Sequence, residues 1–132
     1  MRRQLLIAAT VVAAAGLGLV ACEKQIKAPF EKGVCFHVAT NKDKTLRFNP
    51  VERNVATMEQ CAAILEGVRI RFVRMGSPNR TLTGSYQGSF IFLEKEGIYL
   101  GQTYDGARFM SLVRTGDGRL AVPGAIREVP AQ

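Results

Sequence analysis

Residues 57–72 read TMEQCAAILEGVRIRF, and this stretch decides the fold that the sequence predicts. Thr57, with Gln60 three residues later, forms a capping-box pattern, in which the two side chains satisfy free backbone N–H groups at a helix start. Apolar side chains then recur at steps of three or four residues, at Met58, Cys61, Ala62, Leu65, Val68 and Phe72. The spacing predicts a helix that begins near Thr57, ends near Arg74 and places Cys61 on its buried face.

The second half of this stretch has an alternative interpretation. Residues 68–72 (VRIRF) also alternate with period two, and Gly67 could end the helix before them. In a strand, Arg69 and Arg71 would point the same way and form a basic strip, whereas in a helix they would lie about 200° apart. We favour the helix, with Gly76 as its termination signal.

The segments on both sides of the helix are predicted to be strands. Residues 34–40 (VCFHVAT) and 45–48 (TLRF) are rich in β-branched and aromatic side chains, and the turn 41–44 (NKDK) between them makes a hairpin. Asn49-Pro50 is expected to end the second strand, because proline cannot donate a hydrogen bond to a sheet.

The C-terminal half has the pattern of an antiparallel meander. Its expected strands are residues 82–93, 97–104, 107–114 and 119–122. Asp105-Gly106 is a strong hairpin signal between two of them. Tyr86, Gly88, Phe90 and Phe92 would share one face of the first strand as an aromatic stripe belonging to the core. The predicted fold class is therefore α+β: a small antiparallel sheet, made of the N-terminal hairpin and the C-terminal meander, with one packed helix.

The first 22 residues have the pattern of a secretory signal peptide. Arg2 and Arg3 precede an apolar run from residue 5 to 21, and the run ends in a small-residue cleavage site, residues 19–22 (LVAC). This motif resembles the lipobox of bacterial lipoproteins, whose cysteine thiol receives a diacylglycerol and whose freed amine receives a third acyl chain. The resemblance implies lipidation of Cys22. An uncleaved transmembrane anchor is the alternative, although 17 residues are few for crossing ~30 Å of hydrocarbon.

The resemblance also implies a domain organisation and a location. Residues 1–21 are the signal peptide, 22–32 the lipidated N-terminus with a short polar linker, and 33–132 a single domain. Two or three acyl chains make membrane attachment effectively permanent. In the family an aspartate after the cysteine favours retention in the inner membrane. Because Glu23 stands there, we expect the outer membrane, with the domain facing the periplasm or the cell surface.

The remaining cysteines predict a disulfide. With Cys22 lipidated, Cys35 and Cys61 are an even pair in an oxidising compartment. A bond between them would close a loop of about 25 residues and contribute roughly 3 kcal/mol in the chain-entropy model. The alternative is a metal site that uses Cys35 and His37, which share a strand face. His37 is the only histidine and no second Cys or His cluster completes a tetrahedral set, so we predict no metal.

Charge and residue content limit the function. Removing Arg2 and Arg3 from the 18 Lys and Arg leaves 16 against 11 Asp and Glu, a formal charge of +5 on the mature chain. Export makes nucleic acid an unsuitable partner and leaves another envelope protein or an anionic envelope component. Asp43, Asp105 and Asp117 fall in predicted turns, and no catalytic or phosphate-binding motif is present. We therefore predict no enzyme and no cofactor, and a noncatalytic binding or assembly module.

A second resemblance suggests an alternative function. Gly106-Ala107-Arg108-Phe109 followed by Gly116-Asp117 resembles the paired loops of the membrane-bound inhibitors of c-type lysozyme, which are small bacterial lipoproteins. The resemblance implies that Arg108 and the second loop would enter the lysozyme cleft. Thr115 stands where the family has its inhibitory lysine, and the family's fold is an all-β barrel.

Overall fold

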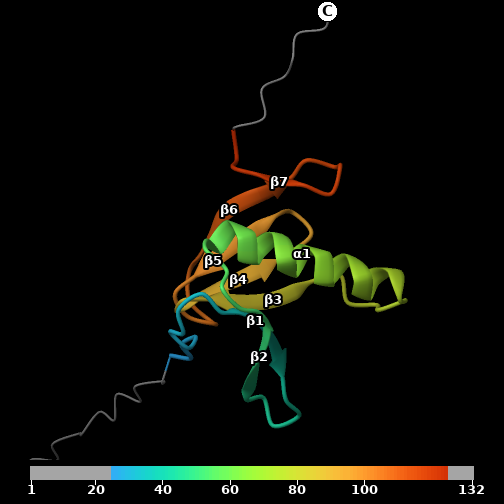
Figure 1. The fold of residues 1–132 in the computed structure, drawn as a ribbon. Helices are drawn as coiled ribbons and strands as arrows, with labels where there is room; N and C mark the ends of the chain where they lie inside the picture. The colour runs from blue at the N-terminus through green and yellow to red at the C-terminus, as the bar shows by residue number, and fades with distance from the viewer. Residues whose placement is uncertain (1–24, 125–132) are drawn as a thin grey trace, which may run out of the picture.

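The computed structural model describes residues 25–124, which form one antiparallel sheet and one helix (Figure 1). The elements in chain order are β1 (Cys35–Thr40), β2 (Leu46–Glu52), α1 (Met58–Arg74), β3 (Leu82–Tyr86), β4 (Ser89–Leu93), β5 (Ile98–Gly101), β6 (Arg108–Arg114) and β7 (Leu120–Ala121). The strand order in space is β2-β1-β3-β4-β5-β6-β7. This confirms the predicted α+β class, with an N-terminal hairpin, a C-terminal meander and a packed helix.

Helix α1 continues to Arg74, so the helical interpretation of residues 68–74 is confirmed. At its start, the Thr57 hydroxyl accepts a hydrogen bond from the Gln60 N–H at 3.2 Å. The Gln60 side chain accepts from the N–H of Ala56 at 3.1 Å, one residue before the position that a capping box predicts. At the other end, the Met75 N–H donates to the Arg71 carbonyl and closes the last turn.

Within residues 25–124, no helix is long and apolar enough to cross a membrane.

The helix lies across one face of the sheet because of how the chain passes from β2 to β3. Strand β1 pairs with both β2 and β3, so α1 must cross over β1 to connect them. Leu65 of α1 packs directly on Gly84 of β3, where any Cβ would clash with the leucine and come within 2.7 Å of the Phe36 carbonyl oxygen. The core on this face comprises Cys35, Val55, Cys61, Ala62, Leu65, Val68, Leu82, Tyr86, Ile91, Leu93, Ile98 and Leu112.

Strand β2 does not end at Asn49-Pro50, so that prediction is wrong. It continues through Pro50 to Glu52, with Pro50 opposite Phe36. β2 is an edge strand, paired on one side alone, and proline is tolerated at such edges. The register shifts beside this pair, between Cys35 and Phe36.

Residues 82–93 form two strands instead of the single predicted one. Gln87 and Gly88 both adopt positive φ, 44° and 85°, as a two-residue hairpin turn of the primed type requires. The turn places Tyr86 on the helix side, whereas Phe90 and Phe92 belong to the cluster on the opposite face. The single aromatic stripe is therefore wrong, although Tyr86, Phe90 and Phe92 are all buried as expected.

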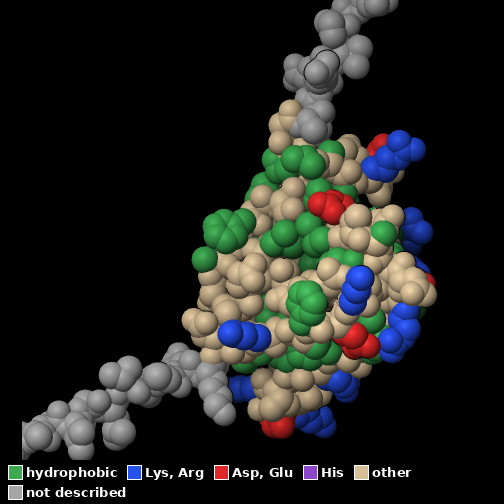
Figure 2. Space-filling model, turned by 60° about the vertical axis from the view of Figure 1, so that its left-hand side comes forward, with side chains coloured by type: hydrophobic (Ala, Val, Ile, Leu, Met, Phe, Trp, Pro, Cys, Tyr) green, Lys and Arg blue, Asp and Glu red, His purple; other side chains and the backbone are tan. Residues whose placement is uncertain are grey.

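The face of the sheet opposite α1 carries an aromatic cluster that the N-terminal segment helps to cover. Phe90 and Phe92 stack with ring centroids 6.0 Å apart, and Tyr104 and Ala28 pack against them. The segment Ile26–Phe30, which the sequence predicts as linker, is hydrogen-bonded to the domain. The Gly88 N–H donates to the Pro29 carbonyl at 3.2 Å, and the Tyr104 N–H donates to the Ile26 carbonyl at 3.1 Å. Figure 2 brings forward the left-hand side of Figure 1, where the N-terminal segment of the described chain lies.

Candidate functional site

The predicted lipidation residue, Cys22, lies outside the described residues. The first residue that the structure describes is Gln25, three positions later. Lipidation of Cys22 therefore stays a prediction from the sequence motif.

The predicted disulfide is present. Cys35 and Cys61 are joined with an S–S distance of 1.99 Å and a Cα–Cα distance of 5.4 Å, and both residues are completely buried. The bond connects β1 to the buried face of α1. Because the Cys35 sulfur is bonded to another sulfur, it is not free to bind a metal together with His37.

His37 has the surroundings of a packing residue. It lies on the helix side of β1, and its ring meets the Phe72 ring edge-on with centroids 6.0 Å apart. Desolvation by burial, helped by the charge of Arg47, lowers the pKa of His37. The imidazole is therefore neutral near pH 7. Residues 25–124 contain no group of three or more His, Cys, Asp or Glu side chains that could hold a metal ion.

The structure brings together an ion-pair cluster that sequence reasoning missed. Glu66 of α1 is 4% exposed and accepts two hydrogen bonds from Arg69, at 2.7 and 2.9 Å. It accepts two more from Arg114 of β6, at 2.7 and 3.1 Å. Arg114 also donates to the backbone carbonyls of Glu94 and Lys95 in the β4–β5 turn. The three-residue spacing of Glu66 and Arg69 on a helix is a signal for the first pair, but Arg114 is 48 positions away.

The arginines control the charge of Glu66. Burial by itself would raise the pKa of Glu66, but hydrogen bonds and charge attraction from Arg69 and Arg114 outweigh it and lower the pKa to about 2. Glu66 is thus ionised at all physiological pH values, with both oxygens engaged. It is a structural anchor between elements and cannot take up a proton as a general base would.

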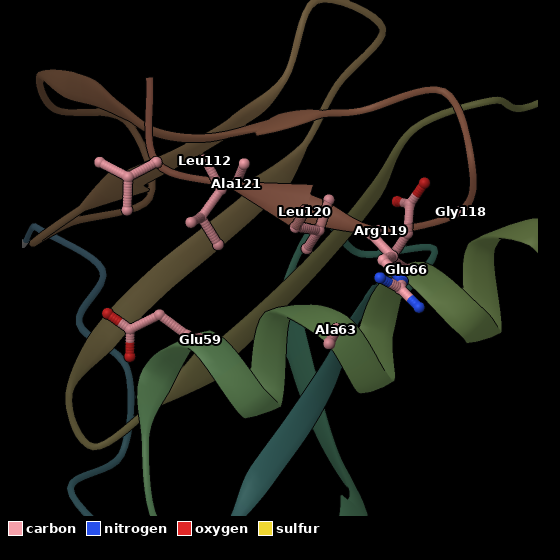
Figure 3. Close-up of a pocket in the computed structure, with 9 residues that line it drawn as sticks. Glu59, Ala63, Glu66, Leu112, Gly118, Arg119, Leu120 and Ala121 are labelled. Carbon is pink, nitrogen blue, oxygen red and sulfur yellow. The ribbon is translucent and has the colours of Figure 1, made fainter. Parts of the chain in front are cut away.

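A groove of about 460 Å³ lies beside this cluster, between α1 and the β6–β7 hairpin (Figure 3). Its lining is mostly apolar, from Ala63, Leu112, Leu120, Ala121 and Val122. Figure 3 shows Glu59 at one end, from the first turn of α1, and Arg119 at the other, close to Glu66. Since Glu66 is fully occupied by arginines, Glu59 is the carboxylate of the lining that remains for a ligand. The groove can hold apolar groups, but it offers no pair of carboxylates for acid–base chemistry.

The C-terminal end of α1 is both basic and apolar. Phe72 and Met75 are exposed there, and with Val68, Arg71 and Arg74 they line a shallow hollow of about 520 Å³. The neighbouring β1–β2 hairpin adds the exposed Arg47, whose charge acts on His37 beside Phe72. This end of the helix therefore combines positive charge with exposed apolar side chains.

The two segments that resemble the lysozyme-inhibitor loops lie at opposite ends of β6. Arg108 is its first residue and Arg114 its last, so the segments are ~20 Å apart at the rise of a strand. Arg108 forms an ion pair with Glu94 at 2.7 Å and lies 3.5 Å from the centre of the Phe92 ring.

Comparison with known proteins finds no matching family model, curated protein or solved structure. The assignment of function therefore depends on this chain's own residues.

Proposed function

We propose that this chain is a lipid-anchored protein of the bacterial envelope, held in the outer membrane through Cys22, whose domain is a noncatalytic binding or assembly module. The observation that carries the proposal is the run Leu19-Val20-Ala21-Cys22 at the end of a 17-residue apolar stretch that follows two arginines. Positive residues, an apolar region and a small-residue cleavage site in this order are the pattern of an export signal.

The disulfide supports export. Bonds such as Cys35–Cys61 persist in oxidising compartments, including the bacterial periplasm, and are rare in the cytosol. At about 3 kcal/mol, this bond would supply a large share of the stability of a domain of this size.

The state of the titratable side chains supports a noncatalytic role. His37 is neutral and packed on Phe72, and Glu66 is ionised with both oxygens engaged. Asp43 and Asp117 accept hydrogen bonds from the backbone and side chains of their own turns, which lower their pKa values. Each of these four groups is engaged in local structure, and the three carboxylates are too weakly basic for proton transfer near pH 7.

The charge distribution supports an anionic partner in the envelope. Arg71 and Arg74 lie beside exposed apolar side chains at the C-terminal end of α1, and a partner with acidic groups and an apolar surface would complement them. Neutralising both arginines as Arg71→Gln and Arg74→Gln should reduce recovery of such a partner from gently solubilised membranes. Exchanging two lysines of the β1–β2 turn, Lys42 and Lys44, for Gln is the matched control.

Metabolic labelling tests the anchor. Cells that express the full chain and take up an alkyne-labelled fatty acid should yield labelled protein, and Cys22→Ala should carry no label because it lacks the acyl acceptor. Ala21→Gly, which keeps a small residue before the cysteine, should retain the label. If the wild-type protein takes up no label, the proposed anchor is wrong.

A separate assay addresses the alternative function. Residues 23–132 contain every strand, the helix, the disulfide and both core clusters of the described structure, so this segment carries a complete fold. Stoichiometric inhibition of a c-type lysozyme by this segment, relieved by Arg108→Ala, would favour the inhibitor over the binding module.

A further inference from the structure

Four exposed hydrophobic side chains gather at the end of the domain where the described chain begins. Residues 25–124 expose seven large hydrophobic side chains, and four of them are Ile26, Phe30, Phe109 and Met110. Phe30 is 77% exposed and Phe109 67%. We name this group, together with Lys27, the tether end.

Backbone and surface contacts show that these residues are neighbours. The loop before β6 is hydrogen-bonded to the N-terminal segment through the Tyr104 N–H and the Ile26 carbonyl, and Phe109 and Met110 follow directly in β6. Gln102 of the same loop lines one hollow with Lys27 and Phe30 and a second hollow with Phe109 and Met110. Both hollows therefore border Gln102. Figure 2 shows hydrophobic side chains distributed over this side of the molecule, with many of the Lys and Arg side chains along one edge.

The chain leaves very little length between this surface and the anchor. Two residues, Glu23 and Lys24, lie between Cys22 and Gln25, so the two ends are three Cα–Cα steps apart and a fully extended chain spans at most about 11 Å between them. The segment that follows is not free to extend further, because the Ile26 and Pro29 carbonyls are hydrogen-bonded to the domain. The headgroup layer on each side of a bilayer is itself several ångströms thick, about 5–8 Å. A lipidated Cys22 would therefore hold the tether end at the headgroup layer.

The chemistry of the tether end suits that environment. Phenylalanine, isoleucine and methionine gain free energy by entering the boundary between headgroups and acyl chains, and lysine next to them attracts lipid phosphates. Among the described residues, the charged groups at this end are the exposed Lys27, Lys32 and Asp105, Glu31, which pairs with Arg53 at 3.3 Å, and Arg108, which pairs with Glu94 at 2.7 Å. Within this described part of the chain, Lys27 and Lys32 form no ion pair and outnumber Asp105, the acid there that forms none.

We propose that the tether end is a membrane-docking surface: Ile26, Phe30, Phe109 and Met110 enter the headgroup region of the bilayer that holds Cys22. The inference rests on the proposed lipid anchor and adds an orientation to it. Strand β3 runs from Leu82, near the C-terminal end of α1, to the Gln87-Gly88 turn at the tether end, so the basic end of α1 points away from the membrane (Figure 1). That end is then free for a partner in the periplasm or outside the cell.

Depth-dependent quenching tests the orientation. The lipidated protein is reconstituted into vesicles of phosphatidylethanolamine and phosphatidylglycerol, with the environment-sensitive dye NBD on a single introduced cysteine. Phe30→Cys and Met75→Cys are matched sites, since the native side chains are 77% and 74% exposed and lie at opposite ends. Dye at position 30 should shift its emission to the blue and be quenched by nitroxide-labelled lipid. Dye at position 75 should show neither effect, and Phe109→Cys should behave like Phe30→Cys.

The outcomes distinguish a failure of the proposed docking surface from a failure of the proposed lipid anchor. Vesicle-bound protein with equal quenching at positions 30 and 75 would overturn the docking surface and leave the anchor intact. Protein that does not float with the vesicles would overturn both. A further pair of variants tests whether the hydrophobic side chain of Phe30 holds this surface in the bilayer. With the dye at Gln102→Cys, the substitution Phe30→Glu should reduce quenching by nitroxide-labelled lipid, and Met75→Glu should not.

Discussion

His37 is the residue whose protonation couples most directly to folding near neutral pH. Its pKa is lowered from 6.5 in the folded protein, first by desolvation and then by the charge of Arg47. In the pH range between the folded-state value and 6.5, the unfolded chain binds more protons than the folded chain. The free energy of unfolding therefore falls as the pH decreases through this range and is fully retained above it.

Replacement of the imidazole should remove this dependence. The chain has no other histidine, so His37→Asn should give a free energy of unfolding that is nearly constant between about pH 7.5 and about pH 5, where the wild-type value declines. Urea unfolding followed by circular dichroism at several pH values measures this. Arg47→Gln removes the charge that helps to lower the pKa of His37. This variant should narrow the pH range over which the free energy of unfolding declines, without abolishing the decline. An unchanged slope in His37→Asn would show that another group is responsible.

At the scale of elements, the position of α1 on the sheet depends on one glycine. Gly84 lies in β3 directly under Leu65, and an added Cβ would meet both the leucine side chain and the Phe36 carbonyl oxygen. The backbone oxygen cannot move without disturbing the β1–β3 pairing, in which Phe36 lies opposite Ser85. Close contact of helix and sheet here therefore requires a residue without a side chain.

Two Gly→Ala variants should have opposite effects. Gly84→Ala should lower the free energy of unfolding by about 1–3 kcal/mol, because α1 must move away from the sheet. Gly67→Ala should raise it by about 0.8 kcal/mol, because Gly67 lies in the interior of α1 with no atom within 4 Å of an added Cβ. Thermal or urea unfolding compares them. Equal effects would mean that the close approach of Leu65 to Gly84 is not required.

At the scale of the whole molecule, Glu66 joins parts of the chain that are far apart in sequence. Through Arg114 it connects α1 to β6, and Arg114 continues the link to the β4–β5 turn. The disulfide connects the same helix to β1 at the other side of the sheet. Together the two links hold α1 to both halves of the sheet, on either side of the Leu65–Gly84 contact.

Loss of the Glu66 charge should destabilise the whole domain. Glu66→Gln should lower the free energy of unfolding by about 3 kcal/mol at neutral pH, because two arginines lose their buried anionic partner. Folding lowers the pKa of Glu66 from 4.5 to about 2, so the contribution of its charge is complete above 4.5 and is lost as the pH falls towards 2. The difference between wild type and variant should shrink over that range. Glu31→Gln, in the exposed pair with Arg53, is the control and should change stability by less than about 1 kcal/mol. Equal losses in both variants would contradict the anchoring role of Glu66.

Much of the fold could be predicted from the sequence, but less of the site. The helix was favoured to about Arg74 because its apolar residues repeat with a helical period and Thr57 caps it, but the period-two alternation of residues 68–72 left a strand open until the structure decided it. The Gln87-Gly88 turn was not, because glutamine rarely adopts positive φ and is not among the usual turn residues. The groove and the ion-pair cluster could not be predicted, because α1 and β6 become neighbours only when the sheet is assembled.

The sequence by itself determined the α+β class, the start of α1 and, with Cys22 taken as lipidated, the Cys35–Cys61 pairing, because periodicity, caps and cysteine parity act over short distances or by elimination. The tertiary structure alone decided that Pro50 lies within a strand, since only the strand order makes β2 an edge. It alone decided that Glu66 is shared by Arg69 and Arg114, and that Ile26–Phe30 packs on the domain. These features depend on contacts between residues tens of positions apart, and such contacts have no signature in local sequence.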